Sequence, residues 1–226
     1  MTDLLSLRNS CYVGNEAAWS RFISAWKQHV PSEHKEYSIV NSIDLCFSES
    51  IGDLICMQEK KLGIAFPQSL KDFLGIGKFR NLEIEGEGFL NAAEVGWLKD
   101  IDRDYFDLLG DFSDDDVLAE NYFKYGRSPL FTELLPGTEE HLLVIAKLSV
   151  SEYFLLNMQF KSMDGEYEVV YLTPSDRIRY PNFAEMMRQY SVVDCHFVND
   201  IGPQSVKMLS EIEWIGNSLI FNPWWT

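Results

Sequence analysis

The sequence predicts an α+β fold in which an antiparallel sheet packs against helices. Helical periodicity dominates the two ends of the chain, whereas period-two runs bounded by turn residues dominate its middle. Of the 226 residues, 46% are apolar and 14% are aromatic, which is enough for one large hydrophobic core. We therefore expect a single domain over residues 1–226.

The first expected helix covers residues 15–30. Its apolar residues recur at helical spacing, and Asn15 is a typical N-cap. We expect Trp19 and Trp26 of this helix to pack on the core, within an N-terminal extension of residues 1–48. Residues 37–47 mix apolar and polar side chains without a clear period, so no element is assigned there.

Two short helices are expected over residues 51–74. Ser50 with Asp53 three residues later predicts the start of the first helix, and Gly63 predicts its end. The second helix begins at Phe66-Pro67, with proline in its first turn, and ends at Gly75-Ile-Gly77. The two helices should meet at a tight corner.

A half-buried strand is expected from Phe79 onward, because apolar residues alternate there with glutamates. The glutamates of this acidic edge are Glu83, Glu85 and Glu87. The capping pattern of residues 91–94 then predicts a helix whose apolar face reaches Leu108 and Leu109.

Three apolar runs predict the rest of the sheet. Residues 142–146 and 153–156 are close in sequence and should pair as antiparallel neighbours. Asp164-Gly165 predicts the next hairpin turn, which leads into a strand over residues 168–172. With the strand after Phe79, we expect at least four strands.

A closing helix is expected after Asn182, which forms a capping pattern with Glu185. Its apolar face should cover the sheet. Pro203 predicts one more helix within the C-terminal segment 199–226. Trp224 and Trp225 end that segment, and we expect them to dock in this domain or in a dimer, because paired tryptophans are costly to expose.

The chain carries a formal net charge of −16. The negative electrostatic field of such a charge repels nucleic acid and anionic lipid, but it attracts basic proteins. We therefore expect a protein partner, with neither nucleic acid nor membrane bound. The alternative is that the acidity serves only solubility. No leader-like segment or membrane-length apolar run is found, so a cytoplasmic location is expected.

No catalytic motif or metal-ligand spacing is found in the sequence. The cysteines are scattered, and the four histidines fall in different expected elements. The acidic triplet at residues 114–116 lacks the alternation and central glycine of a calcium-binding loop. We expect no enzyme activity, no cofactor and no metal site.

The most acidic stretch covers residues 100–116, where Lys99 and Arg103 are the nearby cations. Crowded like charges cost folding free energy that a cationic partner would relieve. The candidate partner-binding residues are Asp100, Asp102, Asp104, Asp107, Asp111, Phe112, Asp114, Asp115 and Asp116, together with Glu83, Glu85 and Glu87. The alternative is a solvated charge run with no partner.

Leu62-Gly63, Phe66-Pro67 and Phe73-Leu74 follow one another as a leucine-glycine turn, an apolar-proline helix start and a short phenylalanine-leucine helix. This order is similar to the opening motif of the SUKH superfamily, which residues 50–198 resemble. Residues 89–94, 155–158 and 182–187 are similar to its strand-to-helix step, central strands and closing helix. Two positions depart from the pattern. Gly75-Ile-Gly77 replaces an asparagine-glycine pair, and Asn157 replaces a common aspartate.

The resemblance implies an α+β fold with a mixed, mainly antiparallel sheet packed against helices. It also implies a non-enzymatic protein. In bacteria it implies an immunity protein that neutralises a secreted or contact-delivered toxin, often a nuclease. Other members, related to a fungal cell-wall-synthesis regulator, imply a scaffold for protein interactions. The two alternatives differ in genome context, because an immunity gene should lie beside a toxin gene.

Overall fold

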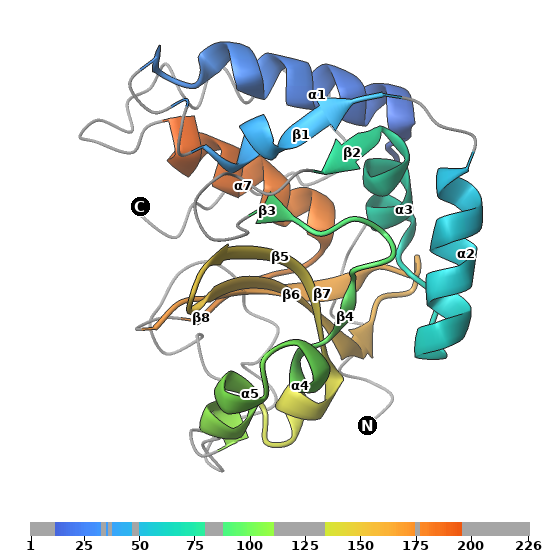
Figure 1. The fold of residues 1–226 in the computed structure, drawn as a ribbon, viewed down its shortest axis with the longest axis vertical. Helices are drawn as coiled ribbons and strands as arrows, with labels where there is room; N and C mark the ends of the chain where they lie inside the picture. The colour runs from blue at the N-terminus through green and yellow to red at the C-terminus, as the bar shows by residue number, and fades with distance from the viewer. Residues whose placement is uncertain are drawn as a thin grey trace.

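The computed structural model describes residues 12–32, 35, 38–46, 50–79, 88–110, 134–174 and 177–195. It confirms the α+β class, with a central sheet that has helices on both faces (Figure 1). The helices are α1 (Glu16–His29), α2 (Ile51–Leu62), α3 (Gln68–Gly75), α4 (Leu98–Ile101), α5 (Arg103–Gly110) and α7 (Phe183–Cys195). The strands are β1 (Ile43–Leu45), β2 (Gly77–Phe79), β3 (Gly88–Phe89), β4 (Gly96–Trp97), β5 (Leu142–Ser149), β6 (Glu152–Lys161), β7 (Tyr167–Leu172) and β8 (Arg177–Tyr180).

The six-stranded central sheet has the order β3-β5-β6-β7-β8, with β4 also paired to β5, while β1 and β2 form a separate ribbon. All the described pairings are antiparallel. The expected hairpins are confirmed, because Leu155 of β6 pairs with Val144 of β5 and with Val170 of β7. Gly165 turns the chain between β6 and β7 with φ +90°, a conformation that favours glycine.

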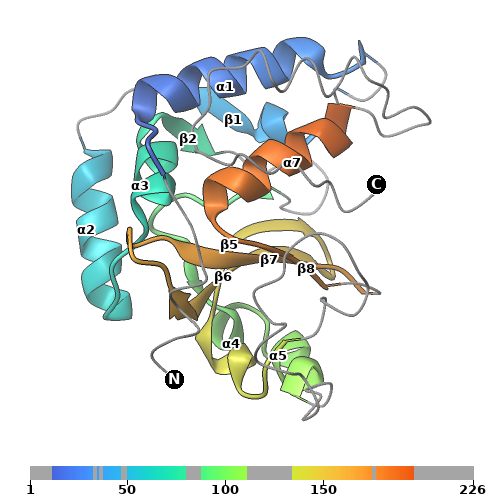
Figure 2. The ribbon, with the colours of Figure 1, turned by 180° about the vertical axis from the view of Figure 1, so that it is seen from behind.

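One face of the sheet, called here the first face, is covered by α3 and α7, with α1 packed outside them (Figure 2). Phe154, Leu156 and Val169 point from the sheet into this core. Trp19 and Trp26 of α1 are 0% and 1% exposed, which confirms that α1 packs on the core. Asn15 caps α1 as expected, by accepting a hydrogen bond from the Ala18 amide at 3.0 Å.

Each buried indole N–H of α1 has a hydrogen-bond partner from another segment. The Trp19 Nε1 group donates to the Tyr12 hydroxyl at 2.9 Å, and that hydroxyl donates to Asp72 of α3 at 2.7 Å. The Trp26 Nε1 group donates to Asp194 of α7 at 2.8 Å. These bonds fix the position of α1, because an unpaired buried N–H would be costly.

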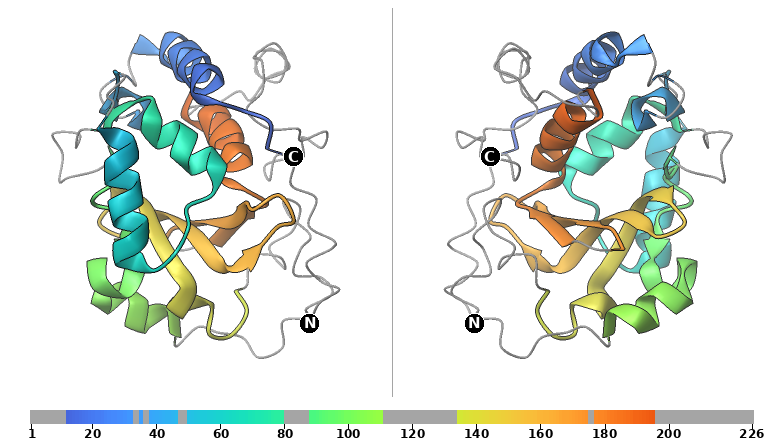
Figure 3. Two further views of the ribbon diagram at one scale, coloured as in Figure 1. Left: turned by 90° about the vertical axis from the view of Figure 1, so that its right-hand side faces the viewer. Right: turned by 90° about the vertical axis from the view of Figure 1, so that its left-hand side faces the viewer.

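The two short helices form as expected, although the first begins differently. Gly63 ends α2 in the left-handed conformation with φ +70°, whereas Ser50 makes no capping hydrogen bond with its side chain. The Gln58 side chain, which donates to the Val95 carbonyl, attaches α2 to the body. Figure 3 shows α2 beside α3 at the edge of the molecule, so of the two helices only α3 covers the sheet.

The continuous helix expected after residue 91 is wrong. Glu94 does reach back to the Asn91 amide at 2.8 Å, but the Asn91 side chain pairs with the backbone of Phe79 at the end of β2. The capping pattern therefore stabilises a single turn. The chain then enters β4, where Gly96 pairs with Val144, before forming α4 and α5.

The other face of the sheet, the second face, carries a separate apolar cluster under α4 and α5. The residues contributed by β5, β6 and β7 are Leu142, Val144, Tyr153, Leu155, Val170 and Leu172. Beside it, the same face holds three buried polar residues on adjacent strands. Asn157 donates to Glu168 at 3.0 Å, and Glu168 forms an ion pair with Arg179 at 3.3 Å.

Candidate interaction face on helices α4 and α5

Helices α4 and α5 present a buried apolar side and an exposed acidic side. Leu98, Phe106 and Leu109 pack on the second face of the sheet. The predicted partner-binding residues Asp100, Asp104 and Asp107 are exposed on the opposite side. We call these three aspartates, together with Ile101 and Leu108, the acidic face; it lies at the lower end of the molecule in Figure 1.

Asp102 occupies the break between the two helices and is half-buried. One of its carboxylate oxygens accepts from the Tyr105 amide at 3.0 Å and so caps α5. The other oxygen accepts from the Tyr153 hydroxyl at 2.5 Å. Among the four described aspartates of the predicted site, Asp102 therefore contacts the protein's own sheet, and it positions the acidic face.

The tyrosines beneath the face belong to the core. Tyr105 and Tyr153 lie with ring centroids 5.5 Å apart, and the Tyr105 hydroxyl donates to the Thr173 carbonyl at 3.3 Å. Burial raises the pKa of Tyr153, and its hydrogen bond to Asp102 raises that pKa further. The Tyr153 hydroxyl therefore stays protonated at neutral pH and continues to donate to Asp102.

The cations of this region are both paired. Lys99 lies 3.4 Å from Glu140, while Arg103 lies 3.0 Å from Asp107 and stacks over the Phe106 ring. Within the described residues, Asp100 and Asp104 have no ion-pair partner. The exposed side of the two helices therefore keeps a net negative charge.

Two exposed aliphatic residues lie within the acidic face, and sequence reasoning did not place them there. Ile101 is 40% exposed and Leu108 is 47% exposed. Leu108 was expected on the buried side of a continuous helix. The break at Asp102 makes α5 a separate helix that packs through Phe106 and Leu109, so Leu108 turns outward.

The remaining predicted partner-binding residues lie outside the described residues. They are Glu83, Glu85, Glu87, Asp111, Phe112, Asp114, Asp115 and Asp116. The structure therefore brings together Asp100, Asp104 and Asp107, and the contribution of the acidic triplet stays a prediction.

The described residues contain no cluster of three or more His, Cys, Asp or Glu side chains suited to hold a metal ion. Nor does any helix in the described ranges combine the length and apolar character required to cross a membrane. Comparison with known proteins found no match to this chain among protein-family models, curated proteins or solved structures.

Proposed function

We propose that this protein is a cytoplasmic immunity protein that binds and neutralises a basic toxin domain through the acidic face. The observation that carries the proposal is the combination of exposed carboxylates and exposed aliphatic side chains on two helices fixed to the sheet. The SUKH resemblance stated above supports the toxin as the class of partner. Neutralisation requires only binding, so the protein needs no chemistry of its own.

Charge and apolar area have different roles in this proposal. Asp100 and Asp104 attract a basic surface and accelerate encounter, which is mainly an effect on the association rate, whereas the charge of Asp107 is partly balanced by Arg103. Ile101 and Leu108 can be desolvated on contact, which slows dissociation. A nuclease is a suitable toxin, because its substrate-binding surface is basic in order to hold phosphates.

The first experiment compares two variants with the same change in net charge. Asp100→Asn/Asp104→Asn neutralises the acidic face, whereas Asp44→Asn/Asp53→Asn neutralises exposed aspartates on β1 and α2. Binding to the toxin encoded by the neighbouring gene is measured by stopped-flow kinetics at low and high salt. The acidic-face variant should associate roughly 2- to 10-fold more slowly at low salt, with a weaker salt dependence.

A second pair of variants tests the aliphatic residues. Leu108→Ser should speed dissociation about 10-fold, whereas Met57→Ser, at a more exposed position on α2, should leave it unchanged. If the toxin binds but each acidic-face variant shows the same kinetics as its control variant, the acidic face is not the interface. If the wild-type protein neither binds the toxin nor protects cells, the immunity function is wrong. Weak binding without inhibition would favour the scaffold alternative.

A further inference from the structure

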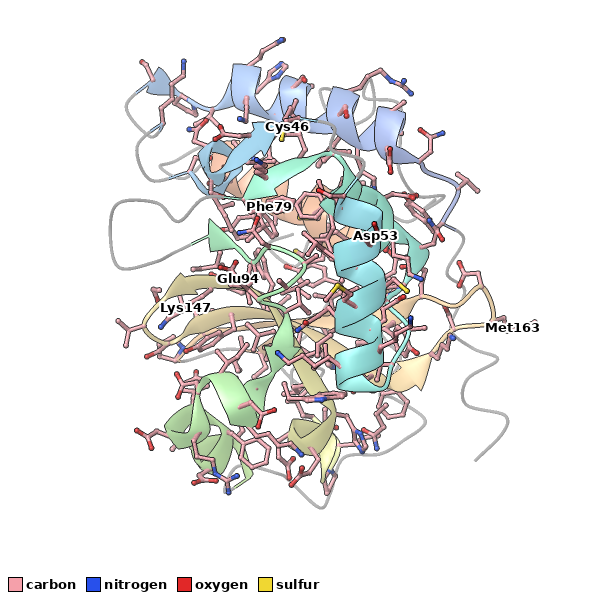
Figure 4. The ribbon with its side chains drawn as sticks, turned by 45° about the vertical axis from the view of Figure 1, so that its right-hand side comes forward. Cys46, Asp53, Phe79, Glu94, Lys147 and Met163 are labelled. Atoms are coloured by element: carbon pink, nitrogen blue, oxygen red, sulfur yellow. The ribbon has the colours of Figure 1, made fainter. Side chains whose placement is uncertain are left out.

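A groove of about 730 Å³ lies between α2, α3 and the start of α1, away from the acidic face. Helix α2, which forms one wall, is in the foreground of Figure 4. Buried Ile51 and Ile55 give the groove an apolar part. Its volume falls within the usual range of about 300–1,000 Å³ for ligand sites.

Among the described residues that line the groove, three carry carboxylates and one, Lys71, carries a positive charge. Two of the carboxylates are held by the protein's own donors. Glu59 accepts from Lys71 and from the Phe66 amide, both at 2.7 Å. Asp72 accepts from Tyr12 and from Gln68, again at 2.7 Å each. These carboxylates are therefore fixed in place before any ligand arrives.

The third carboxylate belongs to Glu16 and lies against Gly75. A Cβ atom at Gly75 would be only 2.5 Å from a Glu16 carboxylate oxygen, so the exposed Glu16 side chain can reach the end of α3 because residue 75 is glycine, and it would have to move if that residue carried a side chain. Gly75 is the last residue of α3, where the unpaired carbonyls carry partial negative charge. Glu16 adds a full negative charge at this point, so this end of the groove favours a cation.

Gly52 of α2 lines the same groove, but for a different reason. A Cβ atom at this position would meet no atom within 4 Å, so packing within the protein does not require glycine. Alanine in place of glycine stabilises a helix interior by roughly 0.5–1 kcal/mol, and Gly52, as the second residue of α2, should show at most this gain. Glycine here leaves the helix backbone open to the groove, which allows another main chain to approach closely.

We propose that this groove binds a short extended segment of a partner protein, which presents an arginine or lysine side chain to Glu16 and Asp72. The main chain of the segment would pass over Gly52. The aliphatic stem of the basic side chain would lie along Ile51 and Ile55, as such stems do on apolar surfaces. Three carboxylates against one ammonium group select a cationic segment. This inference does not rest on the acidic face or on the immunity function.

The test is an NMR titration of the 15N-labelled full chain with defined probes. The first probe is the peptide acetyl-Gly-Leu-Arg-Leu-Gly-amide. A peptide with citrulline in place of arginine keeps the shape but removes the charge, and spermidine supplies charge without a peptide backbone. The arginine peptide should shift the Gly52 and Gly75 amide signals saturably, and should bind at least 5-fold more tightly than either control.

Three variants locate the site. Gly52→Leu fills the groove and should weaken binding of the arginine peptide at least 10-fold, while Glu16→Gln should weaken it about 3-fold. Met57→Leu changes the outer side of the same helix and should have no effect. Retained helical circular dichroism shows that each variant is folded.

Several results would overturn the inference. They are equal binding of the citrulline peptide, binding unchanged by Gly52→Leu, and no saturable shift with the arginine peptide. Spermidine binding as tightly as the peptide would also overturn it, because the groove would then be a site for small cations.

Discussion

Removing one partner of the buried ion pair between Glu168 and Arg179 should destabilise the protein by several kcal/mol. Its side chains are 0% and 2% exposed, and the atoms lie 3.3 Å apart. At an effective dielectric constant of about 20, this separation corresponds to an attraction of about 5 kcal/mol. Arg179→Met removes the cation and leaves the Glu168 carboxylate buried, which should cost about 3–5 kcal/mol of the unfolding free energy.

A double-mutant cycle measures the coupling free energy between Glu168 and Arg179. Glu168→Gln keeps an oxygen for the hydrogen bond from Asn157, so it removes mainly the charge. The double variant with Arg179→Met should lose at least about 2 kcal/mol less unfolding free energy than the two single variants lose in sum. Urea unfolding followed by circular dichroism measures these free energies.

The exposed pair Arg103–Asp107 provides the matched control. It is shorter, at 3.0 Å, but its side chains are 65% and 59% exposed. Solvent screens such a pair, so the same cycle with Arg103→Met and Asp107→Asn should give a coupling of about 0.5 kcal/mol or less. Equal couplings in the two cycles would refute the argument that burial decides the strength of these ion pairs.

Two further predictions concern stability. Gly63→Ala places a Cβ at φ +70° and should lower the unfolding free energy by about 1 kcal/mol in thermal melts. Gly52→Ala at the start of the same helix should not lower it. Equal losses in the two variants would contradict the role of the left-handed cap. Burial raises the pKa of Tyr171 and Tyr190 above the usual value of about 10, because it favours the neutral phenol. The stabilisation of the folded state that these phenols give is therefore complete below pH 10, and it is lost as the pH rises above 10. Urea unfolding should therefore show stability falling above pH 10 by about 1.4 kcal/mol per pH unit for each such tyrosine, and Tyr171→Phe should reduce this slope; a flat profile from pH 9 to 11 would exclude the effect.

Where local chemistry decides the structure, the sequence predicted it well. Asn15 and Asn182 both accept the expected backbone hydrogen bonds at helix starts. Gly63 and Gly165 both adopt positive φ at the expected ends and turns. The apolar runs of β5, β6 and β7 formed neighbouring strands because short connections favour antiparallel pairing.

Where contacts between residues far apart in the chain determine the structure, local sequence patterns could not predict it. The capping pattern at residues 91–94 fits a helix equally well, but the bond between Asn91 and Phe79 and the pairing of β4 with β5 limit it to one turn. The two-residue strands β3 and β4 are too short to show any period.

The same limit applies to the candidate site. The exposed aspartates at 100, 104 and 107 could be predicted from charge density. The inward role of Asp102 depends on Tyr153, which is 51 residues away in the chain. The groove beside α2 combines residues from three helices, so no local pattern could reveal it.

The shared sheet also links the two faces in folding. Strand β6 pairs along both of its edges and sends alternate side chains into both apolar clusters. Neither cluster can lose its sheet wall without exposing the other, so the melting of the sheet is one cooperative event. Helices α4 and α5 pack on the second face through Leu98, Phe106 and Leu109, and their acidic face is exposed. In hydrogen exchange we therefore expect the amides of α4 and α5 to exchange through local openings, while those of β6 exchange only when the whole sheet opens.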